Sequence, residues 1–347
     1  MAVITTGGSG NWSSTTNNAP WPGGTLPTNA DVFVVASGHT VTLDVTTAVA
    51  QGGVVNSGGT LACSTSASSK LTLERDLVVD GTCTLDVSSD VTKICDIVTN
   101  NANSSGTGTL SAAGSASPAN NLGGAVFVRQ TGIITWKGAT RKRWTTLASN
   151  ISAGATSATV TDATGWQVGD VIIFSTTNAY NATAQTDSIT LATVNTGTGA
   201  ITWSGGTTYA HTTSGYVGNF SSNLRIGPKT AGWSGNVTFY NASASTAAKT
   251  INHVAFNYLA TNSYSGSIST NAPFVIFGGD TTDSGWTSFD SNAFYDPRGS
   301  GLVCLRLNAT VNAPSRTNNI YYAPNFQTTQ DYTTNGVIYG TFLSGGC

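Results

Sequence analysis

The sequence predicts an all-β protein, specifically a β-solenoid, and three observations lead to this fold class. A glycine turn followed by a short Thr/aliphatic strand recurs at 38–43, 59–61, 81–85 and 108–110, and this spacing of roughly 20–27 residues is typical of stacked solenoid repeats. Short Val, Ile, Leu and Phe runs alternate with Ser, Thr, Asn and Gly, and no helical periodicity is sustained. Good helix formers are scarce, since Glu74 is the single glutamate.

The repeated phrases also predict how the coils stack. A second strand precedes the turn in two of the coils, at 53–58 and 76–81. Because alternate residues of a strand face the same side, Leu43, Leu61 and Leu85 are expected at equivalent inward positions. One coil cannot bury its own apolar face, so we expect parallel pairing between neighbouring coils.

Composition divides the chain into four predicted segments. They are an N-terminal arm or cap at 1–30, a first β-helix section at 31–143, an antiparallel β insertion at 144–225, and a second β-helix section at 226–347. The first segment is rich in Ser, Asn, Pro and Gly, which is typical of an extended chain. Its Trp12 and Trp21 are expected to cover the open end of the solenoid. A sugar-stacking platform is the alternative role for these two tryptophans.

The predicted insertion has the pattern of antiparallel hairpins. Residues 157–203 hold two hairpin-like units, and a Gly-containing loop at 195–199 joins the strands of the second. Trp166, which precedes the turn at 168–170, is expected to be buried against this unit. Short strands resume after Arg225 with a spacing that again suits solenoid coils.

Charge excludes two classes of partner. A net charge of −2, from 14 basic and 16 acidic residues, gives no field that would attract nucleic acid or an anionic membrane. The N-terminus has neither the basic nor the apolar region of a signal peptide, and no apolar run is long enough to cross a membrane. The basic cluster at 137–143 is interpreted as a solvated turn, with a phosphate or acidic-polymer site as the alternative.

The five cysteines predict no metal site and no cofactor. They form no CxxC pair, and few histidines lie near them. Reduced thiols packed as small hydrophobes are favoured. A disulfide between Cys63 and Cys83 in successive coils is the alternative.

Clustered carboxylates are the best sequence evidence for an enzyme. A lyase on a β-helix needs carboxylates for a metal and a basic residue to take a proton; the densest such group is Asp280, Asp283, Asp290, Asp296 and Arg298. Turn-capping aspartates explain this group better, because Asp hydrogen-bonds its own backbone in turns. We therefore predict no catalytic set.

Three residues remain as candidates for ligand binding: Trp286, Asp290 and His211. His211 has the chemistry of an acid or base. Trp286 belongs to an aromatic tract at 256–295 that offers rings for sugar stacking, although packing between coils or against a second copy of the chain is favoured. This tract is the predicted interface of a homo-oligomer.

Four motifs lie in order at 27–44, 165–176, 209–211 and 219–226. Together they resemble the eight-glycine domain family, which includes hyaluronan-degrading and fibrocystin-like cell-surface proteins. The resemblance covers roughly residues 10–230 and implies a right-handed parallel β-helix with an antiparallel insertion. Where animal members usually have an Arg-Asn pair, this chain has Ser222 before the asparagine.

The opening phrase at 8–15, with the Ala-Pro-Trp-Pro-Gly-Gly phrase at 19–24, resembles virion proteins of tailed bacteriophages that carry this domain. This resemblance implies a non-enzymatic virion protein, such as a capsid decoration, fibre or tail-associated protein. Such a protein would assemble in the host cytoplasm. Its expected partners are itself, as a homotrimer, other virion proteins and host glycans. The alternative is a polysaccharide-degrading enzyme, hyaluronidase-like or lyase-like, on a β-helix.

Overall fold

The computed structural model describes most of the first 228 residues and shorter stretches of the rest. The described ranges are 2–99, 125–129, 131–175, 185–228, 236–240, 245–257, 275–278, 285–295, 305–307, 317–322 and 340–342. Within them, regular structure consists of β-strands and one short 3-10 turn, η1 (Pro22–Gly24).

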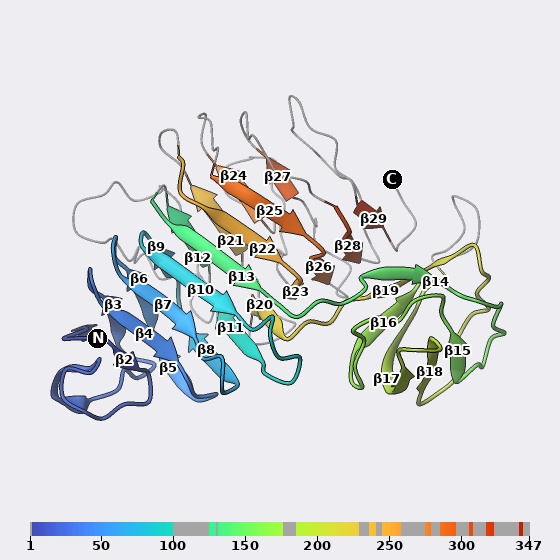
Figure 1. The fold of residues 1–347 in the computed structure, drawn as a ribbon, viewed down its shortest axis with the longest axis horizontal. Coiled ribbons are helices and arrows are strands. Elements are labelled where there is room, and N and C mark those ends of the chain that lie inside the picture. The colour runs from blue at the N-terminus through green and yellow to red at the C-terminus, as the bar shows by residue number, and fades with distance from the viewer. Residues whose placement is uncertain are drawn as a thin grey trace.

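Three parallel sheets form a β-helix (Figure 1). Sheet A contains β1 (Val3–Thr5), β3 (Val32–Val35), β6 (Gly52–Val55), β9 (Leu77–Val79), β12 (Ala125–Arg129), β21 (Asn236–Tyr240), β24 (Val275–Gly278) and β27 (Leu305–Leu307). Sheet B contains β2 (Gly10–Asn11), β4 (Thr40–Leu43), β7 (Thr60–Cys63), β10 (Thr82–Asp86), β13 (Ile133–Lys137), β22 (Lys249–Asn252) and β25 (Trp286–Asp290). Sheet C contains β5 (Ala48–Ala50), β8 (Ser69–Leu73), β11 (Cys95–Thr99), β20 (Leu224–Pro228), β23 (Val254–Asn257), β26 (Ala293–Tyr295), β28 (Asn319–Tyr322) and β29 (Gly340–Phe342).

Successive strands of the chain go to different sheets. β3, β4 and β5 enter sheets A, B and C, and β6, β7 and β8 then pair with them in parallel. Each coil from β3 to β26 therefore contributes one strand to each sheet, and a single apolar core runs between the sheets. The predicted fold class, an all-β parallel β-helix with an antiparallel insertion, is confirmed.

The register of sheet B corrects one predicted alignment. Leu43, Leu61 and Leu85 are all buried and inward-facing, but Leu61 pairs with Val41 and Leu43 pairs with Cys63. Leu61 is therefore two residues away from the predicted column. Gly59 and Gly81 directly precede the paired residues Thr60 and Thr82, but Leu61 lies two residues after its glycine and Leu85 lies four residues after its own, so these leucines fall in different inward columns.

The N-terminal segment is part of the solenoid. β1 pairs with β3 and β2 with β4, both in parallel, so the prediction of an extended arm is wrong for these strands. Trp12 and Trp21 are buried edge-on against Phe33 in the core, and Trp21 Nε1 donates to the carbonyl of Trp12 at 2.8 Å. Both rings are thus unavailable as a sugar platform.

The insertion is a six-stranded antiparallel sheet, called sheet D. Its order is β14 (Trp144–Thr146), β19 (Tyr216–Asn219), β16 (Val171–Phe174), β17 (Asp187–Asn195), β18 (Ala200–Trp203) and β15 (Ser157–Thr159). It has its own core, in which Trp166 is buried, as predicted, and the antiparallel pairing expected at 157–203 is also confirmed. Because β13 precedes this sheet and β20 follows it, the insertion interrupts a single coil between sheets B and C.

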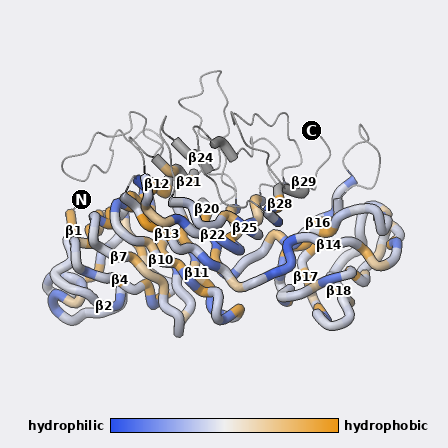
Figure 2. The backbone as a smooth tube through the Cα atoms, turned by 45° about the horizontal axis from the view of Figure 1, so that its top comes forward, coloured by the Kyte–Doolittle hydropathy of each residue, from blue (hydrophilic) through white to orange (hydrophobic). Residues whose placement is uncertain are grey.

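An apolar seam packs the insertion onto the solenoid. Ile173 and Phe220 from the side of the insertion cluster with Ala293, Ile320 and Tyr322 of sheet C. Figure 2 shows a strongly hydrophilic segment where the chain leaves the solenoid for sheet D. Among the described residues, no helix is long and apolar enough to cross a membrane.

Candidate functional site

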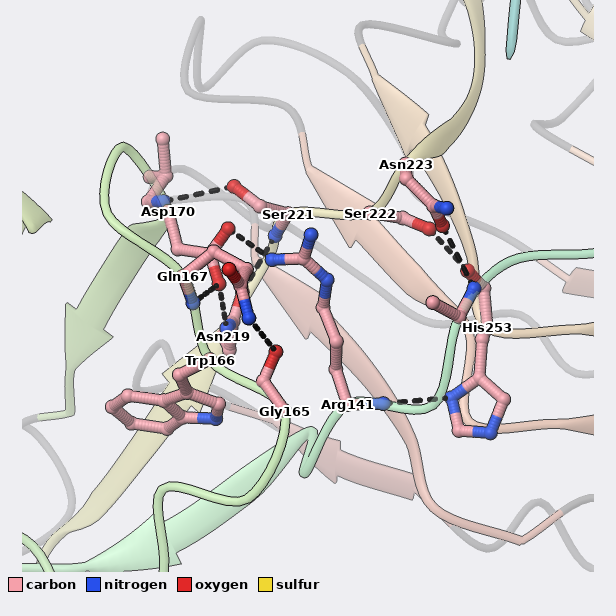
Figure 3. Close-up of polar contacts among 12 residues, drawn as sticks. Arg141, Gly165, Trp166, Gln167, Asp170, Asn219, Ser221, Ser222, Asn223 and His253 are labelled. Atoms are coloured by element: carbon pink, nitrogen blue, oxygen red, sulfur yellow. Dashed lines mark hydrogen bonds and ion pairs between the residues drawn. The ribbon is translucent and has the colours of Figure 1, made fainter. Parts of the chain in front are cut away.

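A group of polar side chains joins the insertion to the solenoid and gathers several motif residues (Figure 3). One link, at 138–143, leaves β13, and a second link, at 220–223, returns to β20. The turn at 165–170 contacts the first link, and Val171 after it contacts the second link. We call these three segments, together with Asn219 at the end of β19, the polar junction.

A buried ion pair lies at the centre of the polar junction. Arg141 donates through Nη1 to Oδ1 of Asp170, and both side chains are 5% exposed. The other oxygen of Asp170 accepts from Asn219 Nδ2 at 2.7 Å and from the N–H of Gln167 at 2.9 Å. Because both carboxylate oxygens have donors and the pair is buried, Asp170 is suited to holding the fold rather than to taking a proton from a substrate.

A second buried arginine, Arg143, donates to backbone carbonyls. Its Nε donates to Ser291 at 2.6 Å, and its Nη1 donates to the carbonyls of Asn219 and Ser221. Burial, and then repulsion from Arg141, lowers the pKa of the Arg143 guanidinium to about 9. The interpretation of the basic cluster as a solvated turn is therefore wrong for these two arginines, because each side chain is buried between the solenoid and sheet D.

Asn223 fastens both links to the preceding coil. Its Oδ1 accepts from the N–H of Ala139 at 2.7 Å. Its Nδ2 lies 2.9 Å from the carbonyl oxygen of Val87 and 3.0 Å from those of Asp90 and Lys93. One buried amide thus connects the outgoing link, the returning link and the loop before β11.

Ser222 and His253 extend the polar junction to the following coil. Ser222 Oγ donates to the carbonyl of His253 and accepts from the N–H of Leu224 at 3.1 Å. The N–H of Arg141 points at Nδ1 of His253 at 3.5 Å. Burial, and then repulsion from Arg143, lowers the pKa of His253 to about 4, so its ring is neutral at neutral pH.

The same corner carries asparagines in the next two coils, a pattern that the sequence analysis missed. Asn292 accepts from the N–H of Val254 at 3.0 Å and donates to the carbonyl of Ile251 at 3.0 Å. Asn319 accepts from the N–H of Asn292 at 2.8 Å and donates to the carbonyl of Phe289 at 3.1 Å. Each asparagine directly precedes a short apolar run in the sequence, which is the signal that could have found them.

His211 is enclosed beside sheet D. Its side chain is 2% exposed, Nε2 lies 2.8 Å from Oδ2 of Asp187, and Nδ1 lies 3.1 Å from the carbonyl oxygen of Ser175. Its ring also stacks on Phe174, with centroids 5.3 Å apart. In this position the imidazole serves packing and hydrogen bonding, and a substrate would have no access to it.

Trp286 and Asp290 both lie on β25, whereas the histidine belongs to the insertion, so the three candidates do not form one site. Trp286 is buried in the solenoid core, where its ring packs against Phe239 at 4.9 Å. This burial removes Trp286 from the candidates for sugar stacking. Asp290 is half-buried at the corner, and its carboxylate accepts from the hydroxyls of Ser291 and Thr317.

Most described rings of the aromatic tract also point inward. Phe256, Phe289 and Phe294 are buried in the same core, which agrees with the predicted packing between coils, so the interface prediction is wrong for these three rings. Tyr295 is half-buried and packs against Phe220 and Tyr322. Rings on alternate positions of short strands fill the narrow interior instead.

The predicted acidic cluster lies largely outside the described residues. Asp280, Asp283, Asp296 and Arg298 fall there, so their role as turn caps stays a prediction. Across the described ranges, no group of three or more His, Cys, Asp or Glu side chains is arranged to hold a metal ion.

Comparison with known proteins gives one family match and two solved structures. The G8 domain model matches residues 20–148, and no curated protein matches the chain. The Pseudomonas phage phi297 tailspike gp61 aligns at 12% identity and TM-score 0.24, over 84% of this chain and 54% of the tailspike. The Gp54 tailspike of Acinetobacter baumannii bacteriophage AP22, solved in complex with A. baumannii capsular saccharide, aligns at 15% identity and TM-score 0.22, over 76% and 53%.

The chain therefore spans about half the length of each tailspike. The family match begins after β1 and β2, covers the following coils of the β-helix and the outgoing link of the polar junction, and ends before the motif at 165–176. Residues 20–148 are thus similar to the G8 domain.

Proposed function

We propose that the chain is a non-enzymatic structural component of a tailed-bacteriophage virion, acting as a decoration, fibre or tail-associated protein. The observation that carries the non-enzymatic part is the polar junction, where Asp170, Asn219 and Asn223 use their polar atoms to fasten the insertion to the solenoid. The virion setting is supported by the similarity to the G8 domain and by the opening phrase at 8–15.

The proposed assembly is a homotrimer in contact with other virion proteins. A solenoid has strand edges at its ends, which must be capped or joined to a partner. Here β1 and β2 pair on one side with β3 and β4 and are the first strands of their sheets. Only 9% of the residues are charged, so charge repulsion does little to keep copies apart.

Contact with host glycans belongs to the same proposal, and burial excludes two of the three residues that were candidates for binding them. Trp286 and His211 are buried, which leaves Asp290 as the accessible residue of the three. Its carboxylate would accept hydrogen bonds from sugar hydroxyls, in exchange for those of Ser291 and Thr317.

To test the non-enzymatic role, the purified native assembly is incubated with hyaluronan, pectin and alginate. Depolymerisation is followed by the appearance of new reducing ends and of ultraviolet absorbance. We expect no depolymerisation by the wild type or by Asp290→Ala. Product that forms with the wild type and is lost in Asp290→Ala would favour the polysaccharide-degrading alternative. His211→Ala is a poor substitute, because removing this buried ring would damage sheet D.

The assembly is tested separately by mass photometry at micromolar concentration. We expect a multiple of 35.4 kDa, with three copies as the specific prediction. A clean monomer that also binds no virion would contradict both the oligomer and the structural role.

A further inference from the structure

One aromatic ring of sheet D lies on the protein surface. Tyr216 is 43% exposed, and it is the one aromatic side chain among the large hydrophobic residues that the described part of the chain exposes. By contrast, Trp166, Phe174 and the neighbouring Val217 are buried in the core of the same sheet. Because alternate residues of a strand face opposite sides, Tyr216 points away from that core.

Trp144 lies beside Tyr216 on the same face of sheet D. β14 is an edge strand of this sheet, and it pairs with β19 so that Thr146 is opposite Tyr216 and Trp144 is opposite Gly218 (Figure 1). The two rings are perpendicular, with centroids 5.4 Å apart. Trp144 is half-buried, because part of it packs against the apolar seam between the insertion and the solenoid. This packing holds the indole in place beside the exposed ring, and we call the two rings the aromatic platform.

Polar side chains border the aromatic platform. Nζ of Lys142 lies 5.8 Å from the centroid of the Trp144 ring and 3.3 Å from Oδ2 of Asp162. On the next segment of chain, Oγ1 of the exposed Thr161 lies 3.2 Å from Oγ1 of Thr146. An ammonium, a carboxylate and two hydroxyls therefore lie close to the rings, and their charges balance.

This combination of groups is suited to a sugar. A pyranose has C–H bonds on its faces, which pack on an aromatic ring, and hydroxyls around its rim, which hydrogen-bond to polar side chains. A stable protein partner needs about 800 Å² on each side with an apolar centre, whereas here two rings lie among polar groups. The balanced charge of Lys142 and Asp162 favours a neutral sugar over an acidic one.

We propose that the aromatic platform binds a neutral glycan of hexopyranose units, with stacking on Tyr216 and Trp144 and hydrogen bonds to the polar side chains at their border. This inference rests on the host-glycan contact of the proposed function, and it names the class of glycan and a place for it on the insertion. Asp290 lies on β25 of the solenoid, so the two places can be tested separately.

An array of bacterial capsular and O-antigen oligosaccharides, both neutral and acidic, tests the aromatic platform. We expect the native assembly to bind at least one neutral oligosaccharide. Tyr216→Ser should weaken that binding by about tenfold, because it removes the exposed ring, whereas Tyr216→Phe keeps the ring and should retain most of the affinity. Trp144→Phe, which has a smaller ring, should weaken binding while circular dichroism shows an intact fold.

Val168→Ser is the matched control, because Val168 is 66% exposed on the same insertion but lies in the turn at 165–170. This variant should bind like the wild type. Binding to no oligosaccharide, binding to acidic ones alone, or unchanged binding by Tyr216→Ser would overturn the aromatic platform. Loss of binding in Asp290→Ala with full binding in Tyr216→Ser would overturn it as well, while leaving the host-glycan contact of the proposed function in place.

Discussion

Replacing Asn223 with alanine should loosen the attachment of the insertion more than any other single amide substitution at the polar junction. The amide of Asn223 is buried, and it serves the N–H of Ala139 and the carbonyls of Val87, Asp90 and Lys93. The alanine variant leaves that N–H without its acceptor and those carbonyls without their shared donor.

The size of the effect follows from these contacts. An unsatisfied buried donor costs about 1–3 kcal/mol, and each lost neutral hydrogen bond about 1 kcal/mol. Together they predict a loss of about 3–5 kcal/mol in the free energy of unfolding. At about 2–4 °C per kcal/mol, the value for domains of about 150–250 residues, Tm should fall by roughly 6–20 °C.

Thermal unfolding followed by circular dichroism measures this change, with Asn29→Ala as the control. Asn29 is exposed, so its replacement should alter stability by less than about 0.5 kcal/mol. Asn223→Asp is the sharper variant, because it keeps the volume and the acceptor for Ala139 but turns a carboxylate oxygen toward three carbonyls. An Asn223→Asp variant as stable as the wild type would refute the hydrogen bonds assigned to this amide.

Three further substitutions test neighbouring parts of the structure. Arg141→Met strands the buried carboxylate of Asp170 and should cost about 3–5 kcal/mol in urea denaturation; adding Asp170→Asn should recover part of that loss. Folding lowers the pKa of His253 from 6.5 to about 4. The free energy of unfolding should therefore be highest above pH 6.5 and should fall, by at most about 3 kcal/mol, as the pH drops toward 4. His253→Asn, which tolerates the φ of 57°, should flatten the stability curve over that pH range, and an unchanged slope would argue against the shift. Gly81→Ala would place a methyl group against the carbonyl oxygens of Asn56 and Gly59 and should cost about 1–3 kcal/mol, whereas wild-type Tm would show that this turn is not close-packed.

The repeat and the insertion could be predicted because both depend on local patterns. Glycine turns and alternating strands set the coils, and the Gly-rich loop at 195–199 marked the hairpin that joins β17 to β18. The exact register of a coil was harder to predict, because Leu61 follows Gly59 by two residues whereas Leu85 follows the equivalent Gly81 by four.

The polar junction could not be predicted, because its partners are far apart in the chain. Arg143 donates to the carbonyl of Ser291, and Asn223 contacts the carbonyl of Val87. A run of arginines and lysines normally indicates a solvated surface, and here the two arginines are buried because the insertion folds back over the link. For Trp286, packing between coils was favoured over sugar stacking, and its burial in the solenoid core agrees with that prediction.

Electron microscopy of the native assembly, isolated from producing cells and labelled through an antibody to this chain, tests the proposed virion role most directly. We predict labels at several symmetry-related positions on a phage particle. Label confined to free, monomeric protein that depolymerises a polysaccharide would contradict it and would identify the chain as an enzyme.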